Sequence, residues 1–257
     1  MKLFDATLDL AAFAQGTEDY TVTSVSGKTL ICDGLSGRVA EFGGGTIWIR
    51  TGEAAGYFGK IQDNAAQTIN LTEELPIASG DEITIGAWLE FDTQKLINAV
   101  NSVLRNYKIM KYNTDLTYDL DDEYYPLPAG VTEDVRAVRI FTSKRYYYSH
   151  YWRVEDGMLD LYDRHGWYHS GDDARIELQY ADVHGAVGKD EEISSQVDPV
   201  YLRYMAWLYL CRNLIQQTHK DNLVASDMYN EAKIYERDYG RLPNKRLKIK
   251  TMTFPQW

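Results

Sequence analysis

Residues 46–61 have the sequence TIWIRTGEAAGYFGKI, and this stretch decides the fold of the first third of the chain. Two runs of β-branched and aromatic residues, 46–50 and 56–61, flank a short connection that contains Gly52. Such runs on either side of a glycine-containing connection predict a β-hairpin. The hairpin indicates that this part of the chain is built from short strands.

Four further segments rich in Val, Ile, Thr and aromatic residues flank the hairpin, and Gly, Asp, Asn and Ser clusters separate them. These segments are residues 20–25, 29–32, 68–71 and 82–88. The triple glycine at 43–45 precedes a strand rather than a helix, so it predicts a turn with positive φ angles and no phosphate-binding loop. Six short strands within residues 1–90 predict a small β-barrel or sandwich.

The periodicity then changes from two to about 3.6 residues. Asp92 is a suitable N-cap for a helix over residues 93–107. Asp198-Pro199 opens a second helix, whose residues 200–217 are apolar on nearly every side and therefore predict burial by several neighbours. An amphipathic stretch over residues 222–239 predicts a third helix. We therefore expect a helical core of one helix plus a C-terminal helical hairpin.

A second β unit separates these helices. After the acidic stretch 115–123, segments typical of strands recur at residues 135–141, 145–154, 158–162, 167–169 and 176–180. The expected fold class is therefore α+β. Its expected parts are an N-terminal β domain (1–90), the helical core (91–112 and 191–240), a β insertion (113–190) and an extended C-terminal arm (241–257).

The C-terminal arm is basic, whereas the rest of the chain is acidic. It contains five basic and no acidic residues; the whole chain carries −11, so residues 1–240 carry −16. A solvated, disordered end would have fewer apolar residues, so we expect the arm to dock on another protein subunit. The expected docking residues are Arg241, Lys245, Arg246, Leu247, Lys248, Ile249, Lys250, Phe254 and Trp257.

The sequence contains residue types that can act in catalysis or bind a metal, but they do not occur at the spacing that these functions require. Asp121-Asp122 lies in a run that lacks the pattern of a calcium loop, and a solvated acidic loop is the favoured interpretation. His150, His165 and His169 do not form a zinc signature, and exposed imidazoles in a turn are favoured. No nucleophile elbow or phosphate-binding motif occurs in the sequence. We therefore expect no catalytic, cofactor-binding or metal-binding residues, no cofactor and no enzymatic activity.

The composition also indicates the cellular compartment and the kinds of partner to expect. Cys32 and Cys211 lie in unrelated contexts and are expected to be buried free thiols in a reducing cytoplasm. The N-terminal stretch lacks a signal-peptide core, and no apolar run is long enough to span a bilayer. The net charge of −11 argues against a general affinity for nucleic acid.

The aromatic run at 146–152, YYYSHYW, allows two interpretations. As one continuous strand it would send Tyr146, Tyr148, His150 and Trp152 to one face and the remaining aromatic residues to the other. Aromatic residues on both faces favour packing in the core or between subunits. The residues that we expect in such packing are Tyr146, Tyr148 and Trp152 of this run and Trp207 of the helix over residues 200–217. The alternative is a carbohydrate-binding surface over residues 146–169.

Three features of the chain resemble head-to-tail connector (neck adaptor) proteins of tailed phages. Residues 45–56, GTIWIRTGEAAG, are similar to a strand pair common in phage structural proteins. Residues 96–101, LINAVN, followed by residues 123–131, EYYPLPAGV, look like an arrangement seen in such proteins. The C-terminal helices with an extended tail are similar to adaptors, whose tails reach into the portal.

The resemblance implies a structural protein of the virion neck, assembled in the host cytoplasm. It implies a homo-oligomeric ring, commonly of twelve copies, beneath the portal, with the portal and the tail or stopper proteins as partners. Genomic DNA would pass through the ring without specific binding, and no membrane would be involved. The alternative function is that of a carbohydrate-binding or other tail or baseplate virion protein that uses residues 146–169.

Overall fold

The computed structural model describes residues 1–35, 42–86, 92–119, 122–141, 146–162, 174–188 and 191–217, together with Asn230, Ile234 and Arg237. Of these residues, 41% lie in strands and 23% in helices, so the described chain is mostly β. The expected α+β fold with a core of one helix and a C-terminal hairpin is therefore wrong. Six strands instead close into a barrel, further sheets follow, and the described part contains three helices.

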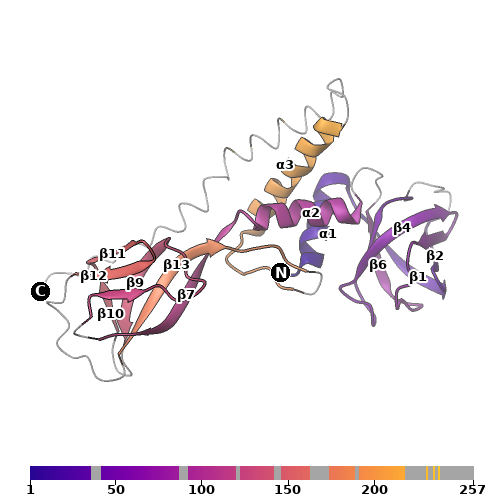
Figure 1. The fold of residues 1–257 in the computed structure, drawn as a ribbon. Helices are drawn as coiled ribbons and strands as arrows, with labels where there is room; N and C mark the ends of the chain where they lie inside the picture. Colours follow the sequence, from indigo (N-terminus) through magenta and orange to yellow (C-terminus); the bar gives the residue numbers. More distant parts are fainter. Residues whose placement is uncertain are drawn as a thin grey trace, which may run out of the picture. The chain divides into compact units, whose positions relative to one another are not determined.

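The chain folds into two compact units. The first, here called the barrel unit, contains Met1–Asn106 and the returning chain from Gly185, which is described to Gln217. The second, here called the sheet unit, contains Tyr107–His184. The sheet unit is thus an insertion in the sequence of the barrel unit (Figure 1).

The six strands of the barrel lie where the segments rich in β-branched and aromatic residues predict them. Its strands are β1 (Glu18–Ser26), β2 (Thr29–Cys32), β3 (Thr46–Ile49), β4 (Phe58–Ala65), β5 (Thr68–Leu71) and β6 (Glu82–Gly86). They pair antiparallel in the closed order β1-β2-β5-β4-β3-β6. Closure satisfies both edges of every strand, so no strand of the barrel presents an open edge.

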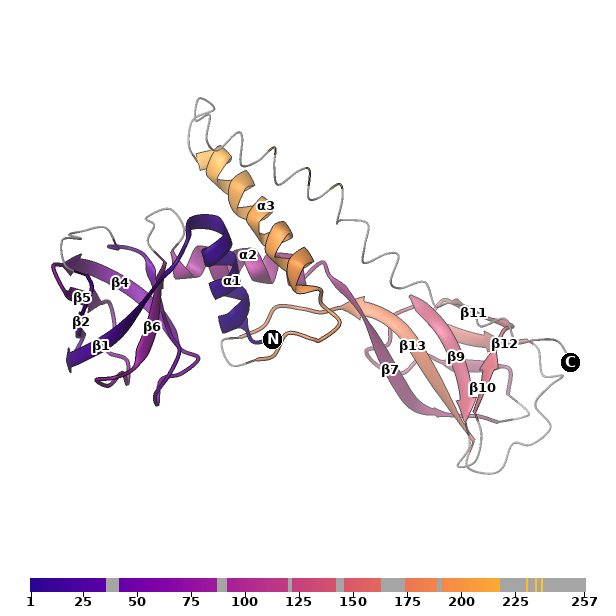
Figure 2. The same cartoon turned by 180° about the vertical axis from the view of Figure 1, so that it is seen from behind.

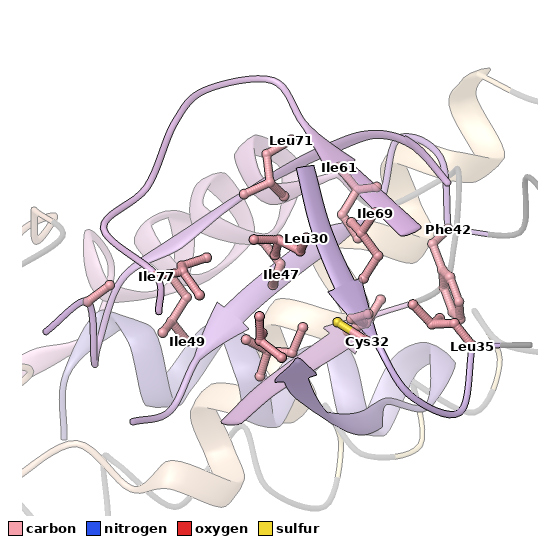
Figure 3. Packing of buried hydrophobic residues seen from close by; sticks show 14 residues of the cluster. Leu30, Cys32, Leu35, Phe42, Ile47, Ile49, Ile61, Ile69, Leu71 and Ile77 are labelled. Atoms are coloured by element: carbon pink, nitrogen blue, oxygen red, sulfur yellow. The ribbon is translucent and has the colours of Figure 1, made fainter. Parts of the chain in front are cut away.

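Aliphatic side chains fill the inside of the barrel. Figure 3 shows Ile47 and Ile49 of β3 pointing into the same interior as Leu30, Ile61 and Ile69, and all five are at most 1% exposed. The triple glycine has two different roles. Gly44 has φ +81°, whereas Gly45 permits close approach, since a Cβ there would lie 2.4 Å from the carbonyl oxygen of Gly86. Only one of the three glycines therefore needs a positive φ angle.

Three helices pack together beside the barrel: α1 (Leu3–Gln15), α2 (Thr93–Leu104) and α3 (Pro199–Gln217) (Figures 1 and 2). Asp92 accepts a hydrogen bond from Lys95 N, and Asp198 accepts one from Val200 N, so both predicted N-caps are confirmed. Sequence reasoning missed α1, which begins just after Lys2. The second helix of the expected hairpin, residues 222–239, lies almost entirely outside the described residues.

The missed helix α1 supplies much of this helical layer. Leu3, Ala6, Leu10 and Ala11 recur at helical spacing and are at most 5% exposed. Asp5 accepts a hydrogen bond from Lys2 N at the start, and Gly16 follows the last residue with φ +76°. Trp48 on the outer face of β3 bonds to Thr7 of α1, and Thr46 bonds to Thr93 of α2. Ile47 and Ile49 face the barrel interior, so all four residues of the strand are buried.

The chain that returns from the sheet unit packs tightly against the helices. Asn101 of α2 donates through Nδ2 to the Val187 carbonyl at 3.1 Å and accepts from Val187 N at 2.9 Å. Ile193 and Val197 are buried in the same return segment. This return segment therefore contributes to the core of the barrel unit.

The sheet unit contains two sheets around one hydrophobic core. The strands are β7 (Lys108–Thr117), β8 (Tyr124–Pro126), β9 (Val135–Phe141), β10 (Tyr146–Ser149), β11 (Trp152–Glu155), β12 (Met158–Leu161) and β13 (Arg175–Val183). One sheet has the order β10-β9-β13-β7 and the other β11-β12-β8. Val138, Ile140 and Leu178 of the first sheet and Leu159 and Leu161 of the second belong to the same buried cluster.

The aromatic run 146–152 does not form one strand. The chain bends at His150 and Tyr151, so that β10 joins the four-stranded sheet and β11 joins the three-stranded sheet. The expected alternation of Tyr146, Tyr148, His150 and Trp152 on one face is therefore wrong. The strand expected at 167–169 lies outside the described residues.

Two expectations from composition can be compared with the structure. Both cysteines are buried and neither forms a disulfide bond, as the sequence predicts. No helix within the described residues is both long enough and apolar enough to cross a membrane.

Candidate interaction surface

The outer face of the four-stranded sheet carries a row of four side chains, one from each strand. In strand order they are Tyr148 of β10, Arg139 of β9, Glu177 of β13 and Tyr112 of β7. The register places Tyr148 and Glu177 directly opposite Arg139, on its two sides. We call these four residues the Tyr-Arg-Glu-Tyr row.

An ion pair lies at the centre of the row. Arg139 pairs with Glu177, and the two side chains are only 23% and 20% exposed. The guanidinium carbon of Arg139 lies 5.4 Å from the ring centroid of Tyr148 and 6.0 Å from that of Tyr112. These distances are within the range of cation–π attraction. The row is therefore held in place by its own contacts.

The two tyrosines at the ends of the row remain accessible. Tyr112 is 57% exposed and Tyr148 is 42% exposed. Tyrosine combines a large apolar ring with a polar hydroxyl and loses little conformational entropy on burial, so it is enriched at protein interfaces. Arg139 Nε is buried and has no hydrogen-bond partner within the described part of the chain. The row therefore has the composition of a binding surface.

Ion pairs also neutralise the acidic residues at one end of this sheet. Burial raises the pKa of Asp134, but hydrogen bonds from Lys108 and Arg136 outweigh it and bring the pKa below its ordinary value. A hydrogen bond from Lys111 lowers the pKa of Asp182. Both carboxylates are therefore charged and paired at neutral pH.

The four-stranded sheet differs in charge from the rest of the chain. Its strands contain five basic and three acidic residues, a net charge of +2. Residues 18–86, which span the barrel, contain four basic and ten acidic residues, a net charge of −6. Residues 107–184 of the sheet unit nevertheless contain nine basic and fifteen acidic residues, a net charge of −6, so both units are acidic overall.

The structure separates the residues for which the sequence predicts subunit packing. Tyr146 and Tyr148 lie on β10, whereas Trp152 begins β11 and packs partly against the core of the sheet unit. Trp207 is 4% exposed and makes an edge-to-face contact with Phe13 of α1, with ring centroids 6.0 Å apart. Of these four residues, Tyr148 is the one that the structure shows in the Tyr-Arg-Glu-Tyr row.

Several predicted residues lie outside the described part of the chain. These are the entire arm 241–257, Asp121, His165 and His169. His150 is described and exposed at the bend between β10 and β11. Within the described ranges, no group of three His, Cys, Asp or Glu side chains is placed to hold a metal ion.

The described part of the acidic stretch is anchored by one buried phenol. The Tyr125 hydroxyl donates to the Asp119 carbonyl at 2.7 Å and to the Asp122 carbonyl at 3.0 Å, and accepts from Asp119 N. Burial raises the pKa of Tyr125 to about 12, although the hydrogen bond with the Asp119 backbone opposes the rise. Because these bonds use the backbone, the structural role of this stretch does not depend on its carboxylates.

Sequence reasoning missed Tyr112, Arg139 and Glu177. A weak signal exists, since Arg139 lies between Val138 and Ile140, and Glu177 between Ile176 and Leu178. Alternation therefore predicts that both charged residues point away from the core. Their contact with each other depends on the pairing of β9 with β13, which are far apart in the sequence.

Comparison of the chain with protein-family models finds no matching family, and comparison with curated proteins finds no match.

Proposed function

We propose that the chain is a non-enzymatic structural subunit of a tailed-phage neck. Copies of it would form a ring that joins the portal to the tail and lines the passage for DNA. The observation that carries an assembly role is the Tyr-Arg-Glu-Tyr row, which presents two exposed tyrosines on a sheet whose other face is buried. The neck itself is proposed from the resemblance of residues 45–56, 96–101 and 123–131.

The charge distribution supports a ring through which DNA passes. The barrel segment carries −6 and the whole chain −11, which opposes tight binding of a polyanion. A passage with acidic walls would let DNA slide without being held. A ring also multiplies each subunit contact, so modest individual contacts are sufficient for a stable assembly.

The C-terminal arm is the proposed contact with the portal or with a neighbouring neck protein. Its apolar residues Leu247, Ile249, Phe254 and Trp257 would supply buried area. Its five basic residues would select an acidic partner surface. This division of roles predicts different effects when the two sets of residues are removed.

The carbohydrate-binding alternative has less support. A stacking platform would need several aromatic rings on one surface, but the bend at His150 and Tyr151 sends Tyr148 and Trp152 to different sheets. Trp152 packs partly against the core, and the ring of Tyr148 lies beside Arg139.

The proposal is tested in particles purified from the culture that produces the chain. We expect the chain in the particles in several copies, and image reconstruction to locate it between head and tail. With purified portal, we expect removal of residues 241–257 to abolish co-assembly, as measured by native mass spectrometry. Absence of the chain from the particles would show that the proposed function is wrong.

Two arm variants separate the contributions. Changing Leu247, Ile249, Phe254 and Trp257 to serine keeps the charge, and changing the five basic residues to glutamine keeps the apolar side chains. We expect the serine variant to lose portal binding at all salt concentrations. The glutamine variant should bind more slowly and lose the salt dependence of the wild type. Unchanged assembly of both variants would exclude a docking role for the arm.

A further inference from the structure

The four-stranded sheet ends in a long strand, β7, whose outer edge is open within the described part of the chain. We propose that this edge receives residues 246–250 of the C-terminal arm of a second copy as an added strand. The inference rests on the proposed function, in which the arm docks on another subunit, and it names the strand on which the arm docks.

The first argument is the length and exposure of the edge. β7 is the last strand in the order β10-β9-β13-β7, and no described strand pairs with its far side (Figure 2). None of its ten residues is buried, whereas five of the nine residues of β13 are buried. The other open edges among the described strands belong to β8, β10 and β11, which have three or four residues each. A long open edge is a template for a strand from another chain.

The backbone of β7 shows which groups point outward. The Tyr107 carbonyl accepts a hydrogen bond from His184 N. The alternation of an antiparallel pair therefore turns the N–H and C=O groups of Lys108 and Tyr112 away from β13. A register shift interrupts the pairing beyond residue 113. The regular part of the edge, residues 108–112, is thus as long as the arm segment 246–250.

The second argument is the sequence of the arm. Pro243 and Pro255 bracket eleven residues without proline, so every residue between them has a backbone N–H for a strand ladder. Over residues 246–250, three basic residues alternate with Leu247 and Ile249. This period of two gives a strand one apolar and one basic face. The apolar face would continue the inner side of the sheet, on which Ile109 of β7 is only partly buried.

The third argument is charge, which sets the direction of the arm. Residues 115–123 begin near the end of β7 and contain five acidic and no basic residues, whereas the arm contains five basic and no acidic residues. The described acidic side chains of this stretch are exposed, and the Tyr125 hydroxyl anchors the stretch through its backbone. An arm antiparallel to β7 would extend Lys245 and Arg241 toward these carboxylates.

The open edge selects between the two acidic units. The barrel segment is as acidic as residues 107–184, but the barrel is closed and presents no strand edge. Both lysines of β7 are ion-paired with carboxylates of the sheet unit, which reduces their repulsion of a basic arm. Charge therefore draws the arm toward both units, and only the sheet unit offers it a long edge in the described part of the chain.

A contact of this kind is heterologous, because each copy gives its arm to one neighbour and accepts an arm from the other. Such contacts generate closed rings when the rotation between copies closes. Main-chain hydrogen bonds would supply affinity, and the side chains of the arm would supply specificity. Removal of the arm would then break the ring itself, which is consistent with the expected loss of assembly on the portal.

The test places a photo-reactive amino acid at position 112 of the full-length chain. On irradiation at increasing protein concentration, we expect a covalent dimer whose cross-linked peptides join position 112 to residues 241–250. Chains of two isotopic compositions, mixed before irradiation, distinguish cross-links between copies from those within one copy. The matched control is position 148, because Tyr148 is also exposed but lies on β10 at the opposite edge of the same sheet. We expect little dimer from the control.

Two substitutions at one position of the arm separate strand pairing from charge. In the proposed register, the N–H of residue 248 points toward β7. Lys248→Gln removes the charge alone, whereas Lys248→Pro removes the charge and this N–H. By sedimentation, the proline variant should associate at least about tenfold more weakly than the glutamine variant. Circular dichroism spectra like that of the wild type would show that both variants are folded.

A change in the acidic stretch tests the charge argument. The double change Asp115→Asn and Asp122→Asn should weaken self-association at low salt, and the difference from the wild type should disappear at high salt. An equal effect at low and high salt would contradict the role of these carboxylates in attracting the arm.

Three further outcomes would overturn the inference: cross-links within one copy only, equal dimer yield from positions 112 and 148, or equal association of the two Lys248 variants. Absence of concentration-dependent association would also overturn it. A chain located between head and tail that fails these tests would contradict this inference alone. A chain that self-associates through β7 but is absent from the particles would contradict the neck function alone.

Discussion

Trp48 of β3 donates a hydrogen bond through its indole Nε1 to the hydroxyl oxygen of Thr7 in α1 at 3.2 Å, and both side chains are buried. The Thr7 hydroxyl donates in turn to the Leu3 and Phe4 carbonyls. Trp48 thus lies on the outer side of the barrel, while its neighbours Ile47 and Ile49 fill the interior. This contact joins the barrel to its helical layer.

The Trp48–Thr7 contact predicts coupled losses of stability. Thr7→Val leaves the indole N–H buried without a partner and should lower the free energy of unfolding by about 1–3 kcal/mol. Trp48→Phe should cost about 2 kcal/mol through lost packing. The double variant should lose less than both changes together, by about 1 kcal/mol, in urea titrations. Thr21→Val, at an exposed site on β1, is the control, and additive losses would contradict the coupling.

Asn101 is a second position at which we expect a substitution to lower the free energy of unfolding strongly. Asn101→Ala would leave both the N–H and the carbonyl of Val187 buried without partners, so we expect a loss of about 2–5 kcal/mol in the free energy of unfolding. The control is Asn98→Ala on the exposed side of the same helix, where we expect a change within about 0.5 kcal/mol. Equal effects of the two substitutions would show that the bridge between α2 and the return segment contributes little.

Gly52 and Gly56 form a matched pair in the turn after β3. Both have positive φ angles, +82° and +90°, but a Cβ on Gly52 would lie 2.2 Å from Asp81 Oδ1, whereas one on Gly56 would meet no atom within 4 Å. Gly56→Ala should cost about 1–2 kcal/mol for the backbone conformation alone. Gly52→Ala should cost at least about 1 kcal/mol more, because Asp81 must move. Thermal unfolding of the two variants measures the difference.

Because the phenol of Tyr125 is buried, we expect its ionisation to lower the stability of the fold at high pH. Its pKa is raised from 10.0 to about 12 in the folded chain, so the neutral phenol stabilises the fold fully below pH 10, and this contribution is lost as the pH rises toward 12. The free energy of unfolding of the wild type should exceed that of Tyr125→Phe by about 1–3 kcal/mol at pH 8. The difference should shrink by about 2 kcal/mol between pH 10 and pH 12.

The control for this measurement is Tyr124→Phe, which removes a hydroxyl at an exposed position of the same strand. At pH 8 it should change the free energy of unfolding by no more than about 0.5 kcal/mol. A wild type and a Tyr125→Phe variant that lose stability in parallel above pH 10 would show that Tyr125 is not the titrating group.

Local patterns predicted much of the fold correctly. Runs of β-branched and aromatic residues between turn residues located all six strands of the barrel, and the caps Asp92 and Asp198 located the starts of α2 and α3. Each of these signals acts over a few residues, so the sequence is sufficient to detect it. The helix α1 was missed because Asp5 and Asp9 interrupt its apolar residues, although its Leu and Ala spacing is helical.

Other features depend on contacts between segments far apart in the sequence. The bend that divides the run 146–152 between two sheets follows from strand pairing and not from the composition of the run, which is aromatic throughout. The candidate surface has the same origin. Arg139 and Glu177 are 38 positions apart in the sequence, and only the register of β9 against β13 brings them together.

The sequence by itself determined the strands of the barrel, the starts of two helices, the burial of both cysteines and the opposite charge of the C-terminal arm, because each is encoded within a short segment or in composition. The tertiary structure decided which helices form the layer beside the barrel, where Trp48 points and which four side chains form the Tyr-Arg-Glu-Tyr row. Side-chain alternation chooses a face of a strand, but only pairing with distant strands decides which residues become neighbours on that face.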